Sequence, residues 1–223
     1  MRPGVVVGLT AEARIARRLG WAVAIGGGTA SGAEAAAQAL VQQGCTGLIS
    51  FGLAGGLDRT LRPGALVVPT AVIVDDQRYA SDANLSQVLG GPTPHVMLGA
   101  DAIVASVADK NRLRERTGAA AVDLESGVVA RVAAMHGIPF AVLRAICDPA
   151  ARALPPAALA ALDTRGSIKV WRVLIAIAAQ PGQLTALFAL AADAATARRS
   201  LIARVRQIAP VPLSMALPPR SPQ

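Results

Sequence analysis

Aromatic residues are scarce in this chain of 223 residues, which holds three Phe, two Trp and one Tyr. A core that lacks large rings has to be filled by Ala, Val, Leu and Ile, which allow helices and strands to approach one another closely. The shortage also argues against nucleic acid as a ligand, because surfaces that bind single strands combine basic side chains with aromatic rings on which the bases stack. We therefore expect no nucleic-acid partner.

Cysteines are few as well, and long apolar runs are lacking. The two cysteines, Cys45 and Cys147, do not have the spacing of metal ligands, so we expect two small hydrophobic side chains in a reducing compartment and no metal site. The apolar stretch VWRVLIAIAA contains an arginine and ends before Pro181, which argues against a membrane-spanning helix. The apolar run at the start is too short for a signal peptide. These absences predict a cytoplasmic protein.

The formal net charge of +8 is unevenly distributed along the chain. From Arg165 onward there are eight basic residues and one acid, Asp193, whereas the rest of the chain is nearly neutral. Because Phe188, Leu201 and Ile202 alternate with several of these arginines, we hypothesise a peripheral, salt-sensitive contact of a C-terminal helix with the inner face of a membrane. The alternative is that the apolar stripe covers a central sheet while the arginines face water.

Apolar runs alternate with helical patterns over the first 150 residues. The runs lie at 4–9, 21–26, 47–52, 65–74, 120–123 and 138–146, and the helical patterns at 11–19, 31–43, 109–116 and 125–136. This alternation is typical of βαβ units, and it predicts an α/β fold with a largely parallel, buried central sheet and helices on both faces. We expect one domain over residues 1–209, with a catalytic core to about residue 150, a helical extension over 151–209 and a disordered tail over 210–223.

Glycines and acids follow several of the predicted strands. The turn GGGTASG follows the second strand, GLAGG the third, and the acidic sequences DLE and CDP follow two later strands. Ligands of open α/β sheets bind at the carboxyl ends of the strands, so we expect these groups to lie close together. Taken singly, each has an ordinary structural explanation, such as a tight turn for the glycines and helix or turn capping for Asp123, Glu125 and Asp148.

The order of three motifs resembles the nucleoside phosphorylase and nucleosidase superfamily over about residues 4 to 150. The motifs are GLTAE, SFGLAGGLDRTLRPGALVVP and AVDLESGVVARVAAMHGIPFAVLRAICDPA. The region after residue 150 further resembles the hopanoid-associated phosphorylase subgroup, which is linked to the removal of adenine from adenosylhopane. The resemblance implies a three-layer α/β fold of the nucleoside phosphorylase type, with a central mixed sheet, helices on both faces and a helical C-terminal extension. It also implies cleavage of the N-glycosidic bond of a purine nucleoside that releases adenine, and assembly as a homo-oligomer.

The resemblance also implies roles for single residues. Asp148 matches the aspartate that donates or shares a proton at N7 of the purine, and Glu125 matches the glutamate that binds the ribose hydroxyls. Leu124 stands where the family has a methionine against the sugar. Ile103 and the backbone of Val104 match the segment beside the base. Asp123 is expected to be structural.

The nucleophile is the part of the pattern that departs most from the family. Glu12 resembles the acid that activates water in the nucleosidases. The region expected around the nucleophile or an anion comprises Gly28, Leu53, Ala54, Gly55 and Arg14. Hydrolysis and phosphorolysis both stay open, with phosphate as a possible co-substrate and no other cofactor. The alternatives are a methylthioadenosine or S-adenosylhomocysteine nucleosidase, a general purine nucleoside phosphorylase, and a non-catalytic protein that binds a nucleoside or lipid.

Overall fold

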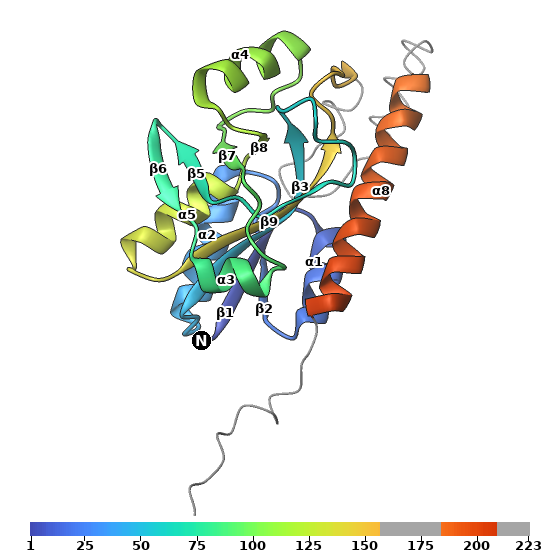
Figure 1. Cartoon of the computed structure of the whole chain (residues 1–223). Coiled ribbons are helices and arrows are strands. Elements are labelled where there is room, and N and C mark those ends of the chain that lie inside the picture. Colours follow the sequence, from blue (N-terminus) through green and yellow to red (C-terminus); the bar gives the residue numbers. More distant parts are fainter. Residues whose placement is uncertain (157–183, 209–223) are drawn as a thin grey trace, which may run out of the picture.

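The computed structural model describes residues 1–156 and 184–208, and within them nine strands form one mixed sheet (Figure 1). The strands are β1 (Pro3–Val7), β2 (Ala22–Ile25), β3 (Gly47–Gly56), β4 (Leu66–Val67), β5 (Ala71–Val74), β6 (Gln77–Ala80), β7 (Val96–Gly99), β8 (Ala121–Asp123) and β9 (Phe140–Asp148). The described α-helices are α1 (Thr10–Ala16), α2 (Ala30–Gln42), α3 (Ala83–Val88), α4 (Val107–Thr117), α5 (Ser126–Met135) and α8 (Leu184–Ile208), and a short 3-10 helix, Arg17–Leu19, follows α1.

The centre of the sheet is formed by the two longest strands, β3 and β9. They run parallel to each other, and β1 pairs parallel with both β2 and β3. Parallel strands that are covered on both faces consist of nearly continuous apolar residues, and β9 follows this rule except at Arg144 and Asp148. β3 extends to Gly56, beyond the predicted end at residue 52, because GLAGG continues the pairing with β9 and then pairs antiparallel with β8.

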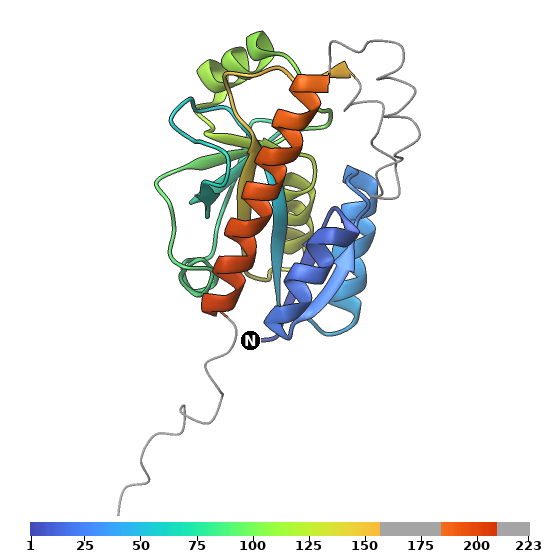
Figure 2. The same ribbon diagram turned by 90° about the vertical axis from the view of Figure 1, so that its right-hand side faces the viewer.

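Helices cover both faces of the sheet, which confirms the predicted three layers (Figures 1 and 2). On one face α2 and α5 contribute small buried side chains such as Ala37 and Ala130. On the other face α1, α3 and α8 pack over β9 and β3. Because many of these residues are alanines, the helices lie close to the strands without large side chains between them.

Several short elements between residues 66 and 99 differ from the prediction. The single strand expected over 65–74 is wrong, since β4 ends at Val67 and β5 begins at Ala71. Pro69 lies in the gap, and it has no N–H group that could continue a strand ladder. The short elements β6, α3 and β7 were not predicted at all. Runs of four to six residues are too short to show a clear period in the sequence.

The last described helix packs against the sheet. Ala197, Leu201 and Val205 of α8 are fully buried in the same cluster as residues of β9. Leu201 is therefore a core residue, which corrects its expected place on a membrane-facing stripe. No helix in the described ranges is long and apolar enough to cross a membrane. Residues 157–183 of the expected helical extension and the tail over 210–223 fall outside the described residues.

Candidate active site

The frame of the site is the pair of strands β3 and β9. Gly52 of β3 lies opposite Arg144 of β9, and Gly55 lies opposite Asp148 after a shift in register between Ala54 and Gly55. Such a shift is a bulge, which redirects the side chains that follow it. Gly52 and Gly55 are three residues apart on one strand, which separates the polar groups beside them by roughly 10 Å. The strand pair therefore supports two groups of charged side chains, one around Gly52 and one around Gly55.

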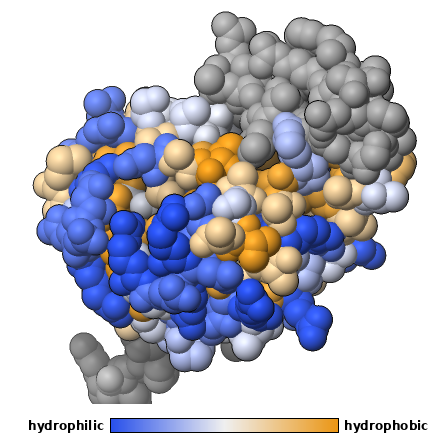
Figure 3. Space-filling view, turned by 90° about the horizontal axis from the view of Figure 1, so that it is seen from above, coloured by the Kyte–Doolittle hydropathy of each residue, from blue (hydrophilic) through white to orange (hydrophobic). Residues whose placement is uncertain are grey.

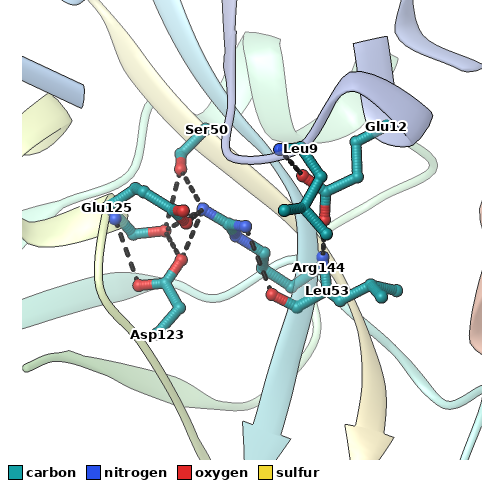
Figure 4. A network of polar contacts seen from close by, with 8 residues as sticks. Leu9, Glu12, Ser50, Leu53, Asp123, Glu125 and Arg144 are labelled. Atoms are coloured by element: carbon teal, nitrogen blue, oxygen red, sulfur yellow. Dashed lines mark hydrogen bonds and ion pairs between the residues drawn. The ribbon is translucent and has the colours of Figure 1, made fainter. Parts of the chain in front are cut away.

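Arg144 holds the first group together (Figure 4). Its side chain is 1% exposed, and its Nη2 atom lies 2.5 Å from Asp123 Oδ2 and 2.8 Å from Glu125 Oε2. The same nitrogen donates to Ser50 Oγ over 2.7 Å, and Nη1 donates to the carbonyl oxygen of Leu53. Burial lowers the pKa of Arg144, but the surrounding carboxylates outweigh this effect and raise the pKa above its ordinary value. Arg144 is thus a permanent buried cation that is neutralised by acids from other elements.

Gly52 gives Arg144 the room to cross β3. A Cβ atom at this position would lie 2.6 Å from Arg144 Nη1 and 2.5 Å from Glu12 Oε1, and the φ angle is 153°. Both facts favour glycine, because a side chain would displace two charged groups and strain the backbone. The glycine that ends the sequence SFG is therefore explained by the close approach of Arg144 and Glu12 to β3, which it permits.

Asp123 fixes the start of α5. Its Oδ1 atom accepts from the backbone N of Ser126 over 3.1 Å, and its Oδ2 atom accepts from Ser126 Oγ over 2.6 Å. These bonds satisfy donors at the helix N-terminus, where a carboxylate is also favoured by the helix dipole. With Arg144 on the same oxygen, both oxygens of Asp123 are occupied. These contacts agree with the structural role expected for Asp123.

Glu125 has one oxygen bound and the other directed toward two glycine turns. Oε2 pairs with Arg144, whereas Oε1 lies where a Cβ atom on Gly8 would come within 2.3 Å, and within 4.0 Å of the corresponding position on Gly28. Burial raises the pKa of Glu125 to about 7, although Arg144 opposes this effect. The structure therefore brings Glu125 and Gly28 together as predicted, with Oε1 in the space that the glycines leave free.

Glu12 reaches the same place from α1. Its Oε2 atom accepts from the backbone N of Leu9 and its Oε1 atom from the backbone N of Leu53, each over 2.8 Å. The residue is 3% exposed, and burial raises its pKa against the opposing effects of Arg144 and of the backbone donors. Glu12 and Leu53 therefore lie together as predicted. Arg14 does not join them, because it is on the exposed side of α1.

Asp148 forms the second group with Lys110, a residue that sequence analysis missed. Lys110 Nζ lies 2.6 Å from Asp148 Oδ2, and Oδ1 of the same carboxylate has no hydrogen-bond partner within the described residues. Burial raises the pKa of Asp148, while Lys110 and Arg152 oppose this effect. The only sequence signal for Lys110 is its position three residues before Leu113 in an otherwise polar helix, which is too weak to single it out.

The apolar residues expected at the site are partly buried or exposed. Leu53, Leu124 and Val104 are partly buried, Val104 packs against a cluster that includes Leu57 and Leu98, and Ile103 is 39% exposed. The backbone N of Leu154 donates to the carbonyl oxygen of Ala105, so the segment before α4 is tied to the segment after Asp148. The segment that contains the residues expected beside the base is thus joined to the segment that follows Asp148.

On the face at which β3 and β9 end, apolar residues (orange) lie among hydrophilic ones (Figure 3).

A separate surface cavity of about 530 Å³ lies beside α5 and β6, where it is lined by Tyr79, Arg131 and Met135 among others. None of the predicted site residues lines it. Within residues 1–156 and 184–208, no group of three or more His, Cys, Asp or Glu residues is arranged to hold a metal ion.

An α/β domain with acids at the carboxyl ends of its central strands belongs to the class that binds small ligands at that edge. The family profile described as the phosphorylase superfamily matches residues 18–96 and 92–174. The chain belongs to this superfamily, which confirms the expected family and, at that level, the expectation of an enzyme. The matched ranges include Asp123, Glu125, Arg144 and Asp148, but they begin after Glu12. A search of curated proteins found no significant match.

Solved structures of low sequence identity share the fold. An S-adenosylhomocysteine nucleosidase from Streptococcus pyogenes is 18% identical with a TM-score of 0.61, covering 67% of this chain and 84% of its own. Futalosine hydrolase from Helicobacter pylori is 17% identical with a TM-score of 0.64, covering 92% and 97%. A 5′-methylthioadenosine/S-adenosylhomocysteine nucleosidase from Colwellia psychrerythraea, in complex with adenine, is 17% identical with a TM-score of 0.62, covering 80% and 95%. At this identity the likeness concerns the fold.

Proposed function

We propose that the protein hydrolyses the N-glycosidic bond of an adenine nucleoside. The observation that carries this proposal is the placement of three largely buried carboxylates, Glu12, Glu125 and Asp148, along the ends of β3 and β9. Burial raises the pKa of each of them, which brings a carboxylate closer to the range in which it can exchange protons at neutral pH. Membership of the phosphorylase superfamily supports the reaction class.

In the proposed reaction the bond between C1′ of the sugar and the base breaks, and its electron pair leaves with the base. Asp148 supplies a proton to the departing purine, which neutralises the developing negative charge. Glu12 accepts a proton from a water molecule whose oxygen then bonds to C1′. Glu125 holds the ribose hydroxyls through Oε1, the oxygen that Arg144 leaves free. The products are the free base and a sugar with a hydroxyl at C1′.

Hydrolysis is favoured over phosphorolysis by the charges around Gly52. Glu12, Asp123 and Glu125 surround one cation, Arg144, whose Nη2 is already paired with two of these acids. A phosphate dianion entering this group would meet more negative than positive charge, which opposes its binding. Arg14, the cation expected to bind an anion, is exposed on the other side of α1. Water carries no charge and meets no such opposition.

For the 5′ substituent we propose a large apolar group, as in adenosylhopane. This finer proposal rests on the resemblance of the C-terminal region to the hopanoid-associated subgroup and on Ile103, an exposed apolar residue in the segment expected beside the base. A lipid-linked substrate also favours the peripheral membrane contact, and the superfamily resemblance favours a homo-oligomer. The second candidate is a methylthioadenosine or S-adenosylhomocysteine nucleosidase, the activity named for two proteins of similar fold.

A panel of adenosines with different 5′ groups, incubated with and without phosphate, tests these proposals. We expect adenine release that does not depend on phosphate and that Glu12→Gln abolishes. We expect Asp148→Asn to lower turnover by about 10²-fold or more, because the leaving base loses its proton donor. Asp58→Asn is a suitable control, because Asp58 pairs with Arg114 and with none of the proposed catalytic residues. Formation of a ribosyl phosphate, or turnover by Asp148→Asn close to that of the wild type, contradicts the proposed mechanism.

A further inference from the structure

Lys110 is the one buried residue of α4. Its side chain is fully buried, and its Nζ atom donates to Asp148 Oδ2 over 2.6 Å, to the carbonyl oxygen of Pro149 over 3.1 Å and to that of Arg152 over 2.8 Å. An ammonium group has three N–H donors, so all of them are used. The other cations of this helix, Arg112, Arg114 and Arg116, are exposed or partly exposed.

Burying a lysine to anchor a helix costs desolvation free energy. Removing an ammonium group from water is compensated only when its partners are well placed, and an apolar side chain of similar size often serves the fold equally well. The position of Lys110 therefore calls for an explanation other than packing. Its one carboxylate partner is the acid to which the proposed function assigns protonation of the leaving base.

The contact with Lys110 gives the two oxygens of Asp148 different surroundings. Oδ2 is held by Lys110, whereas Oδ1 is buried and has no hydrogen-bond partner among the residues described by the structure. A buried polar atom without a partner is uncommon in folded proteins and points to a ligand that completes its bonding. Gly55 has no side chain beside the carboxylate, and a Cβ atom there would lie 3.6 Å from Oδ2, which is ordinary contact distance.

The same ammonium group also shapes the segment after β9. It binds the carbonyl oxygens of Pro149 and Arg152, and the side chain of Arg152 pairs with Asp193 of α8. The segment is thereby fixed between α4 and α8. Because Leu154 is bonded to Ala105, this arrangement also holds the residues expected beside the base.

We propose that Lys110 is a positioning residue of the active site, which turns Asp148 so that Oδ1 faces the leaving base and keeps this acid strong enough to give up its proton. This inference rests on the proposed function, because it assigns Asp148 the role of proton donor. The ammonium group opposes the increase in the pKa of Asp148 that burial causes. Without it, Asp148 would keep its proton to higher pH and would transfer it less readily.

The test is Lys110→Met, which removes the charge and keeps an unbranched side chain. We expect kcat to fall by about 10-fold or more while KM changes little, because Lys110 acts through the proton donor rather than on the bound sugar. We also expect the alkaline limb of the pH profile to move to higher pH by about one pH unit or more. Lys110→Arg, which keeps a positive charge, should return the alkaline limb toward that of the wild type.

Two comparisons separate positioning from general stability. Arg114→Met removes a cation that pairs with Asp58 from the same helix, and it should leave the pH profile unchanged. In the Asp148→Asn background, Lys110→Met should lower kcat no further, because its effect passes through the carboxylate. A full additional loss in the double variant, or a loss in the single variant without movement of the alkaline limb, overturns the proposal.

A direct titration of Asp148 by carboxyl ¹³C NMR decides the matter even if the proposed reaction is wrong. The pKa of Asp148 should be higher in Lys110→Met than in the wild type, and Lys110→Arg should largely restore it. An unchanged titration in a folded variant overturns the electrostatic effect. If the titration moves but the wild type releases no base from any nucleoside, the proposed function fails while the effect of Lys110 on Asp148 stands.

Discussion

The ionised form of Glu125 lowers the stability of the folded protein. Its pKa in the folded protein is about 7, compared with an ordinary value of 4.5, and the main cause is burial. A folded-state pKa above the unfolded-state value means that the folded state binds the proton more tightly. The free energy of unfolding therefore falls as the pH rises from about 4.5 to about 7, by at most about 3 kcal/mol from this residue.

Glu125→Gln should accordingly stabilise the protein at pH 8 while it weakens substrate binding. The neutral amide avoids the buried charge, and Asp123 still neutralises Arg144. Urea unfolding should show a gain over the wild type of up to about 3 kcal/mol at pH 8 and a smaller gain at pH 5. Asp123→Asn is the control, and it should destabilise the protein because Asp123 holds both Arg144 and Ser126. Equal destabilisation by the two variants at pH 8 would contradict this account.

The acids of the site could be predicted from the sequence, but the cations could not. Glu125 and Asp148 follow predicted strands, and the carboxyl ends of strands are where ligands bind in such sheets. Arg144 lies inside the apolar run FAVLRAI, where a charge indicates a special environment without naming its partners. Its partners come from β3, β8 and α5, and that of Lys110 lies 38 residues further along the chain. Contacts of this kind are set by the packing of elements, which local patterns do not contain.

At the scale of elements, length decided which predictions succeeded. β1, β3 and β9 contain buried runs that the sequence shows clearly. The buried residues of α2 recur at helical spacing, and α5 is apolar and buried along most of its length. The missed elements β6, α3 and β7 are held mainly by their neighbours. β6 and β7 each pair with β5, for example. α3 has only six residues, and its local signal is the cap in which Asp82 accepts from the backbone N of Leu85 over 2.8 Å.

The helix α8 should contribute to stability through its buried stripe. Leu201→Ala should lower the free energy of unfolding by about 2–5 kcal/mol, because Leu201 is fully buried and its loss leaves a cavity against the sheet. Phe188→Ala is the matched control on the same helix, since Phe188 is 71% exposed, and it should change stability by less than about 0.5 kcal/mol. Urea unfolding measures both. Equal effects would mean that α8 does not pack against the sheet in solution.

At the scale of the whole molecule, the packing of α8 changes how the protein could meet a membrane. With Leu201 and Val205 in the core, the buried stripe of the helix is not available for insertion into lipid. The outer side of α8 carries Arg199 and Arg206, which are exposed and lie seven residues apart on one stripe. Arg204 instead links α8 to the residue that follows α3, because its Nη1 atom donates to the carbonyl oxygen of Leu89. The proposed contact therefore depends on charge rather than on inserted apolar residues.

Flotation with vesicles of phosphatidylglycerol and phosphatidylcholine tests this contact. We expect binding at low salt that falls at high salt, because exposed charges are screened within about 8 Å at physiological ionic strength. Changing Arg199 and Arg206 together to Gln should weaken binding, whereas the same change at Arg112 and Arg116, two exposed arginines of α4, should have little effect. Arg204 is left in place so that the fold is preserved. If the wild-type protein does not float with the anionic vesicles even at low salt, the exposed arginines of α8 have another role, and the proposal of a lipid-linked substrate loses this support.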